Sequence, residues 1–125
     1  MTALTLFGLA LAPLYSAIAE VESHRGGLSD NVYQIRKVYV KDLQRIYPSM
    51  GIMEWEVHDK HLSETMMFLY WKHYGRLYAE RTGGLITYEV LARIHNGGPR
   101  GYEKIETKPY WERVRKELVK MGVMK

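Results

Sequence analysis

Residues 92–101, which read ARIHNGGPRG, decide the fold of this chain. Just upstream, Leu91 and Ile94 recur at helical spacing and Thr87 is a good N-cap, so the spacing predicts a helix that begins near Thr87. Residues 96–101 follow as a turn-dense loop. Its three glycines permit close approach of the backbone to a ligand, but it lacks the lysine of a phosphate-binding Walker loop and follows no strand. The stretch predicts a tight turn that displays His95, Asn96 and Arg100.

Four other segments carry apolar residues at helical spacing. The first predicted helix has Pro13 in its first turn and ends at Gly26-Gly27, and the second runs from Ile35 and stops before Pro48. The third runs from Leu62 to Gly83-Gly84, and the last begins near Thr107. Residues 49–59 read as a loop, and only residues 26–34 look able to form a small hairpin. The predicted class is α+β, predominantly α, in a single domain over residues 1–125, with four to five helices and at most a very small β-hairpin.

The composition is that of one globular domain. The chain has 125 residues, 46% apolar and 26% charged, which excludes a disordered tail, a fibre and a multi-span membrane protein. It has no cysteine, which excludes a disulfide scaffold, a thiolate metal site and thiol catalysis. Lys and Arg total 18 against 14 for Asp and Glu, and this net charge of +4 suits an acidic polymer, either nucleic acid or bacterial wall.

Residues 1–12 are almost wholly apolar, yet too few to span a bilayer, which needs roughly 20 residues. They could be the apolar region of a signal peptide, with Ala17-Ile18-Ala19 as a cleavage site. Against this, no Lys or Arg precedes Arg25, and cleavage there would destroy the first helix. We therefore expect a segment that packs on the domain.

Glu20 and Glu22 lie at the end of the first helix. Residues two positions apart are separated by a rotation of about 200° around the helix axis, so the two carboxylates cannot share a face. Glu22 borders the apolar stripe beside Ile18 and Val21. A half-buried carboxyl there would have a raised pKa, as a general acid requires. The alternative is two solvated glutamates on an exposed helix end.

Asp30 follows eight residues after Glu22, beyond the two glycines. If the chain folds back there, Asp30 could face Glu22 across a cleft, and two carboxylates that flank a glycosidic bond are the usual glycosidase arrangement. The alternative is that residues 29–31 are simply a turn.

A second polar cluster comprises His58, Asp59, His61 and Glu64. His58 and His61 could bind a metal, but a solvated helix N-terminus is the favoured interpretation. His73 sits on an apolar helix face, as a core or cleft-wall histidine. We expect no metal and no cofactor.

Three segments together resemble the invertebrate-type (destabilase-like) lysozyme family. The first is Val21-Glu22-Ser23, and the second is Tyr33-Gln34-Ile35-Arg36, followed by Tyr39 and Asp42. The third is residues 92–101 with Thr107 and Tyr110-Trp111 downstream, which is close to the family's Ala-Arg-x-His-Asn-Gly-Gly-Pro-x-Gly and Thr-x-x-Tyr-Trp pattern. Their order is kept over residues 14–118.

The resemblance implies a lysozyme-like fold and a muramidase that cleaves the β-1,4 bond between N-acetylmuramic acid and N-acetylglucosamine. Glu22 would be the general acid, and Asp30 the second carboxylate, as nucleophile or oxocarbenium stabiliser. The implied partner is peptidoglycan or a chitooligosaccharide, bound by a monomer that acts at the bacterial cell wall, with no nucleic acid and no stable membrane span. The sugar cleft would be lined by Tyr33, Gln34, His95 and Asn96.

The chain also departs from the family. Animal members are rich in cysteine, and its absence here fits synthesis in a reducing compartment, as in a bacterium or phage. The segment from Glu22 to Gln34 is shorter than in the animal enzymes, and His24 and Val32 stand where the family usually has glycine. These changes leave open a non-catalytic domain that binds cell-wall glycan and retains the fold. A basic helical module for nucleic acid or a membrane surface is a third possibility, though the last helix also carries Glu112 and Glu117.

Overall fold

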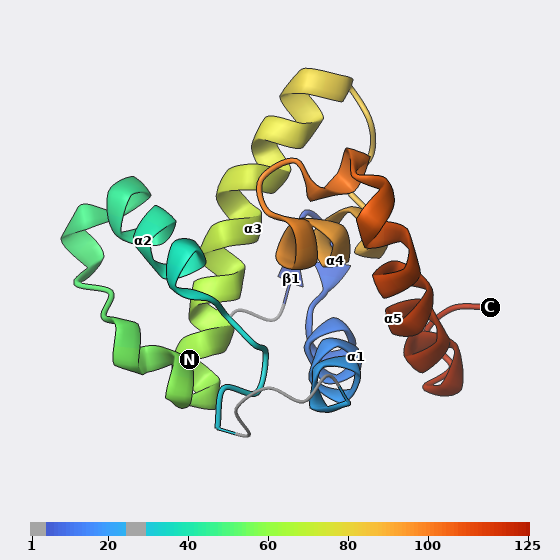
Figure 1. Cartoon of the computed structure of the whole chain (residues 1–125). Coiled ribbons are helices and arrows are strands. Elements are labelled where there is room, and N and C mark those ends of the chain that lie inside the picture. Colours follow the sequence, from blue (N-terminus) through green and yellow to red (C-terminus); the bar gives the residue numbers. More distant parts are fainter. Residues whose placement is uncertain (1–4, 25–29) are drawn as a thin grey trace.

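We describe the protein from a computed structural model, in which residues 5–24 and 30–125 are described. The α-helices in this part are α1 (Ala12–Ser23), α2 (Lys37–Ile46), α3 (Lys60–Thr82), α4 (Tyr88–Gly97) and α5 (Lys108–Lys120). Short 3-10 helices lie between them: η1 (Pro48–Met50), η2 (Glu54–His58), η3 (Gly101–Glu103) and η4 (Ile105–Thr107). The predicted class, predominantly α with a tiny sheet, is confirmed (Figure 1).

The small hairpin lies elsewhere than predicted. Strands β1 (Thr5–Leu6) and β2 (Leu9–Ala10) pair antiparallel, and the turn between them is made by Phe7 and Gly8, with φ of 52° and 77°. Two positive φ values fit the twist of a tight hairpin. In the predicted range 26–34, residues 30–34 form no strand, because the Asn31 side chain bonds both the N–H and the carbonyl of Ile35. Residues 26–29 lie outside the described part.

Residues 5–11, the described part of the N-terminal segment, pack on the domain. Leu6 and Leu9 contact the core, and Leu11 is fully buried. The Phe7 ring lies so close to α3 that a Cβ on Gly75 would meet its Cε2 at 2.7 Å. This segment therefore covers one side of the central helix.

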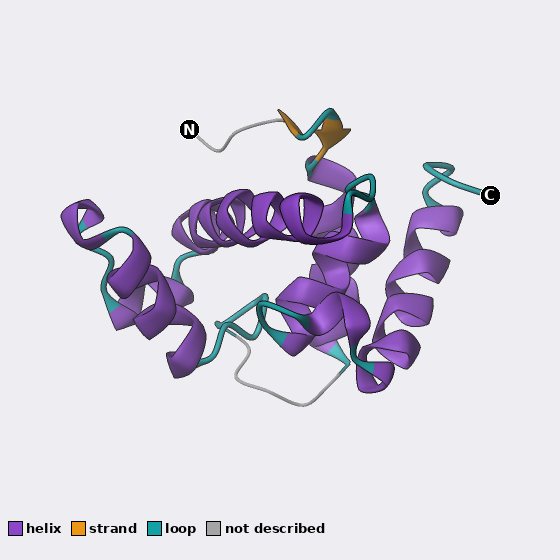
Figure 2. Ribbon diagram, turned by 90° about the horizontal axis from the view of Figure 1, so that it is seen from above, coloured by secondary structure: helices purple, strands orange, loops and turns teal. Residues whose placement is uncertain are grey.

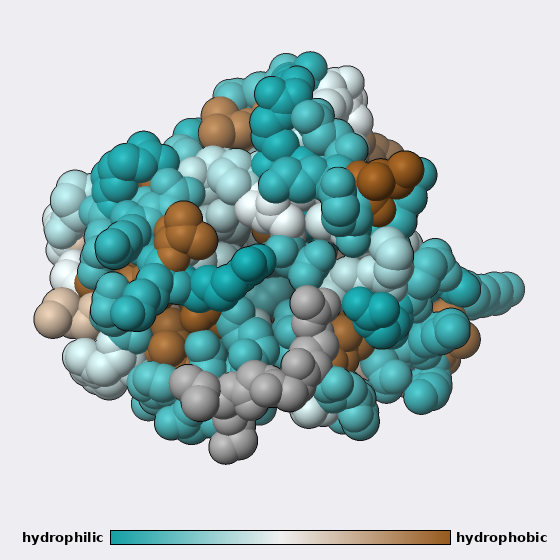
Figure 3. Space-filling model, in the orientation of Figure 1, coloured by the Kyte–Doolittle hydropathy of each residue, from teal (hydrophilic) through white to brown (hydrophobic). Residues whose placement is uncertain are grey.

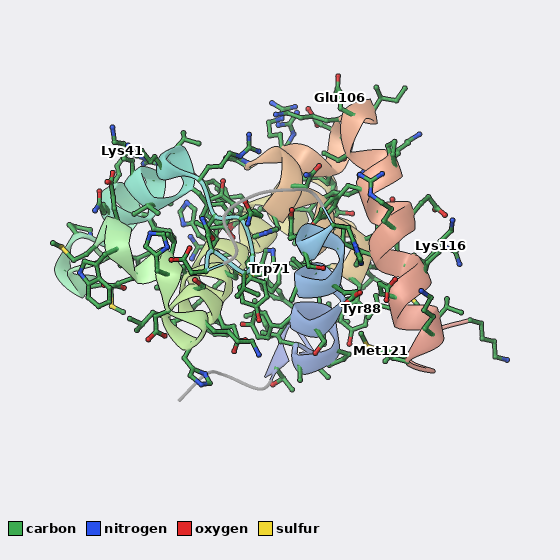
Figure 4. All side chains as sticks on the ribbon, turned by 60° about the horizontal axis from the view of Figure 1, so that its bottom comes forward. Lys41, Trp71, Tyr88, Glu106, Lys116 and Met121 are labelled. Carbon is green, nitrogen blue, oxygen red and sulfur yellow. The ribbon has the colours of Figure 1, made fainter. Side chains whose placement is uncertain are left out.

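Helix α3 is the centre of the molecule. It joins α2, η1 and η2 on one side to α4, which packs with α1 and α5, on the other, as the view from above shows (Figure 2). Three side chains of α3 are at most 1% exposed: Met66, Met67 and Trp71. The Trp71 indole N–H donates to the carbonyl of Leu91 at 2.8 Å, which fixes α3 against α4 in the middle of the core (Figure 4).

The remaining helices follow their predicted starts and ends closely. Thr87 caps α4, and its hydroxyl accepts a hydrogen bond from the N–H of Val90. Helix α1 ends at Ser23, and the glycine pair predicted to end it, at 26–27, lies outside the described residues. The surface in Figure 3 is mainly hydrophilic with scattered apolar spots. In the described ranges no helix combines the length and the apolar character needed to cross a membrane.

Candidate functional site

Glu22 is a buried carboxyl in the last turn of α1. Only 5% of the residue is exposed, beside the equally buried Ile18 and Val21. Glu20 points into solvent instead, where it bonds His24 Nε2 at 3.0 Å. The two carboxylates thus lie on different faces of the helix, as the spacing predicts.

Tyr110 holds Glu22 from the neighbouring helix α5. Its hydroxyl donates to Glu22 Oε2 at 3.0 Å, and Tyr110 itself is 1% exposed. The two residues meet because α1 and α5 pack along each other. Sequence reasoning noted Tyr110 as part of a motif but gave it no role, and a contact across 88 positions has no local signal.

A cleft of about 770 Å³ separates α2 from the loop that follows α4. Tyr70 and Tyr74 of α3 lie between these two walls. The cleft walls carry aromatic rings and cations. Their residues come from α2 (Val38, Tyr39, Lys41, Asp42, Arg45), from the last turn of α4 and the segment after it (His95, Gly97, Gly98, Pro99, Lys104) and from the linker before α2 (Gln34, Arg36). Such a surface offers both stacking and hydrogen bonding to a sugar.

His95 lines this cleft but is held on both ring nitrogens. Nε2 lies 2.9 Å from the carbonyl oxygen of Tyr33, and Nδ1 lies 3.2 Å from the Tyr39 hydroxyl. Because a carbonyl only accepts, Nε2 carries the hydrogen and a neutral His95 accepts from Tyr39. His95 therefore fastens α4 to α2 and to the linker, and it presents a ring edge to the cleft.

The other predicted sugar-binding residues lie around the linker. Arg36 donates to the carbonyl of Asn96 at 3.1 Å, which joins the two walls of the cleft. Gln34 lines the cleft with φ of 53°, and its side-chain N–H donates to the carbonyl of Asn31. Tyr33 is 0% exposed, so it supports this linker from the core below the surface.

Asp42 contributes a carboxylate to the cleft wall. It accepts hydrogen bonds from the Tyr74 hydroxyl and from Arg45. Burial, together with the Asp42 carboxylate, raises the pKa of Tyr74 to about 12. The phenol therefore stays protonated and holds α2 to α3 at neutral pH.

Asp30 lies in a different environment from Glu22. Its side chain is 65% exposed and its carboxylate lies 3.2 Å from His58 Nδ1. Residues 25–29, which connect it to α1, are outside the described part. The pairing of Asp30 with Glu22 across a cleft stays a prediction.

Glu64 corrects the interpretation of residues 58–64 as a uniformly solvated helix start. Asp59 does cap α3, and His58 and His61 are exposed, but Glu64 is only 9% exposed. It accepts from the Tyr33 hydroxyl at 2.5 Å, because α3 turns this position toward the core. Within the described ranges no group of three or more His, Asp or Glu could hold a metal.

The glycine-rich motif makes its contacts mainly with other parts of the protein. A Cβ on Gly101 would lie 1.9 Å from the carbonyl oxygen of Arg93, so this glycine allows the loop to pack on α4. Arg93 is itself buried and bonds Thr107, Glu89 and the carbonyl of Lys104. The close approach predicted toward a ligand is thus made, at this glycine, to the protein's own backbone.

Comparison with known proteins finds two similar bivalve proteins. The chain is 35% identical to a lysozyme of Meretrix lusoria over 91 residues, which cover 73% of this chain and 69% of that protein. It is 51% identical over 37 residues to lysozyme 1 of Crassostrea virginica, covering 30% of this chain and a fifth (20%) of that protein. No protein-family model matches the chain.

Proposed function

Because the chain belongs to the invertebrate-type lysozyme family, which places it among lysozyme-type glycoside hydrolases, we propose that it is a muramidase. It hydrolyses the β-1,4 bond between N-acetylmuramic acid and N-acetylglucosamine in peptidoglycan, and it acts at the bacterial cell wall. The observation that carries this proposal is the buried carboxyl of Glu22, held by Tyr110.

Glu22 is the general acid in this scheme. Burial disfavours the carboxylate form, which keeps a proton available for the leaving oxygen of the glycosidic bond. The Tyr110 hydroxyl donates to Oε2 and so fixes how the carboxyl group and its proton lie at the end of α1. Tyr110 is thereby a positioning residue for the proton.

Asp30 is the proposed second carboxylate, as nucleophile or stabiliser of the oxocarbenium ion. It must approach the sugar opposite Glu22 when substrate is bound. The cleft supplies the sugar-binding surface, with Gln34, His95 and the Asn96 loop on its walls and Tyr33 beneath. Its cations, among them Arg36 and Lys41, suit the carboxylates that peptidoglycan carries.

The test is hydrolysis of a bacterial wall suspension, followed by turbidity and by the release of reducing ends. Wild type should clear the suspension, and Glu22→Gln should lose activity by a factor of about 10² to 10⁴, the usual contribution of a general acid. Glu20→Gln, on the exposed face of the same helix, is the matched control and should keep full activity. Equal clearing by wild type and Glu22→Gln would refute the assignment.

The exposure of Asp30 favours a second candidate, a domain that binds cell-wall glycan without cleaving it. In that case Asp30 serves only to contact His58, and Glu22 serves the fold. Retention on insoluble peptidoglycan without any release of reducing ends would establish this alternative. Asp30→Asn separates the two candidates, because it should lower hydrolysis only if Asp30 reaches the sugar.

A further inference from the structure

A second hollow, of about 480 Å³, adjoins the cleft. It is bordered by the linker before α2, by the start of α2 and by η2, and it shares Gln34 and Arg36 with the cleft. His58, the partner of Asp30, stands on its rim. Gln34 and Arg36 therefore form a common border of the cleft and the hollow.

Trp55 lines the hollow with an exposed indole. It is 59% exposed, whereas Trp71 and Trp111 are 0% and 7% exposed. Trp55 is outside the hydrophobic core, so its ring contributes little to holding the fold. An indole face in a hollow is a stacking surface for the apolar face of a ring.

Polar groups surround this indole. The exposed side chains of Glu54 and Lys37 and the amide of Gln34 line the same hollow. Glu54 brings an acceptor and Lys37 a donor to this hollow, as the hydroxyl and N-acetyl groups of a sugar require. A protein or lipid partner would need a wider apolar face than one indole beside charged groups.

We propose that Trp55 forms an outlying sugar subsite, which stacks on one ring of the same β-1,4-linked glycan after the chain leaves the cleft. This inference rests on the proposed function for its substrate class, an N-acetylhexosamine polymer. The subsite strengthens the binding of long glycan chains, and Gln34 and Arg36 form the passage between it and the cleft.

The experiment uses the three tryptophans as its probe. Chitohexaose is titrated into Glu22→Gln protein, and binding is followed by calorimetry and by acrylamide quenching of tryptophan fluorescence. Because Trp55 alone among the three indoles is exposed, binding should protect most of the quenchable emission. Trp55→Ala should lose that response and bind about tenfold more weakly, the ratio expected for one stacking contact.

Trp55→Phe keeps an aromatic face and should restore most of the affinity. Ile105→Ala, which removes another exposed apolar side chain outside both hollows, should bind like its parent. Unchanged affinity in Trp55→Ala, or calorimetric binding that leaves Trp55 fully quenchable, would overturn the inference. If Trp55 is protected in this titration but the wild-type protein releases no reducing ends from peptidoglycan, the proposed function is overturned and the subsite stands.

Discussion

Replacing Tyr110 by Phe removes the hydroxyl that donates to Glu22 Oε2 at 3.0 Å and leaves the buried ring in place. A hydrogen bond to a charged group contributes about 1.5–3 kcal/mol and one to a neutral group about 0.5–1.5 kcal/mol. The hydroxyl therefore favours the carboxylate form of Glu22 over the acid by roughly 1 kcal/mol, which corresponds to about 0.7 pH unit.

A general acid works only while protonated, so loss of its proton sets the alkaline limb of the kcat/KM profile. Without the Tyr110 hydroxyl the carboxylate is less favoured, and the alkaline limb should move upward by about 0.7 pH unit. The assay is release of reducing ends from a soluble substrate across the pH range, with folding checked by circular dichroism. A general loss of packing would lower the rate at every pH without moving the limb.

Tyr88→Phe is the matched control, because the Tyr88 hydroxyl donates to the carbonyl of Ala10 at 2.6 Å and not to Glu22. Its alkaline limb should stay where it is in the wild type. An unmoved or lowered limb in Tyr110→Phe would refute the reasoning that this phenol tunes the acid.

Two further predictions concern the stability of the helices and the loop that border the cleft. Gly101→Ala should lower the free energy of unfolding, measured in urea, by about 3 kcal/mol or more. The new Cβ would lie 1.9 Å from the carbonyl oxygen of Arg93, and neither backbone segment can move away easily. A loss below about 1 kcal/mol would contradict this prediction. The phenol of Tyr74 has a pKa of about 12 when folded and 10 when unfolded, so its stabilising contribution is complete below pH 10 and is lost as the pH rises through 12. Tyr74→Phe should make the fall in stability between pH 10 and 12 shallower by up to about 3 kcal/mol, measured by urea unfolding at each pH, and an identical slope in both proteins would argue against it.

Helix positions were predictable because apolar periodicity is local. The spacing of Leu62, Met66 and Leu69 located α3, although it assigned one apolar stripe to a helix that is buried on several sides. Met67 and Trp71 lie outside that stripe and are fully buried, because elements pack on more than one face of α3. Periodicity detects an amphipathic surface helix better than a central one.

The hairpin and the environment of the acid needed tertiary information. Strands of two residues leave no alternating pattern, and the glycine pair at 26–27 was the stronger turn signal. Helix geometry placed Glu22 at the border of the apolar stripe and left a solvated carboxylate open, whereas its burial and its bond to Tyr110 depend on how α1 and α5 pack. Glu64 is buried for a similar reason, since its partner Tyr33 comes from the linker before α2.

The most direct test of the account is the identity of the sugar at the newly formed reducing ends of a peptidoglycan digest, determined by mass spectrometry after borohydride reduction. The account predicts reduced N-acetylmuramic acid in the digest by wild type and none above background with Glu22→Gln. Reduced N-acetylglucosamine, or the same products from both proteins, would contradict the central claim that Glu22 donates the proton in a muramidase reaction.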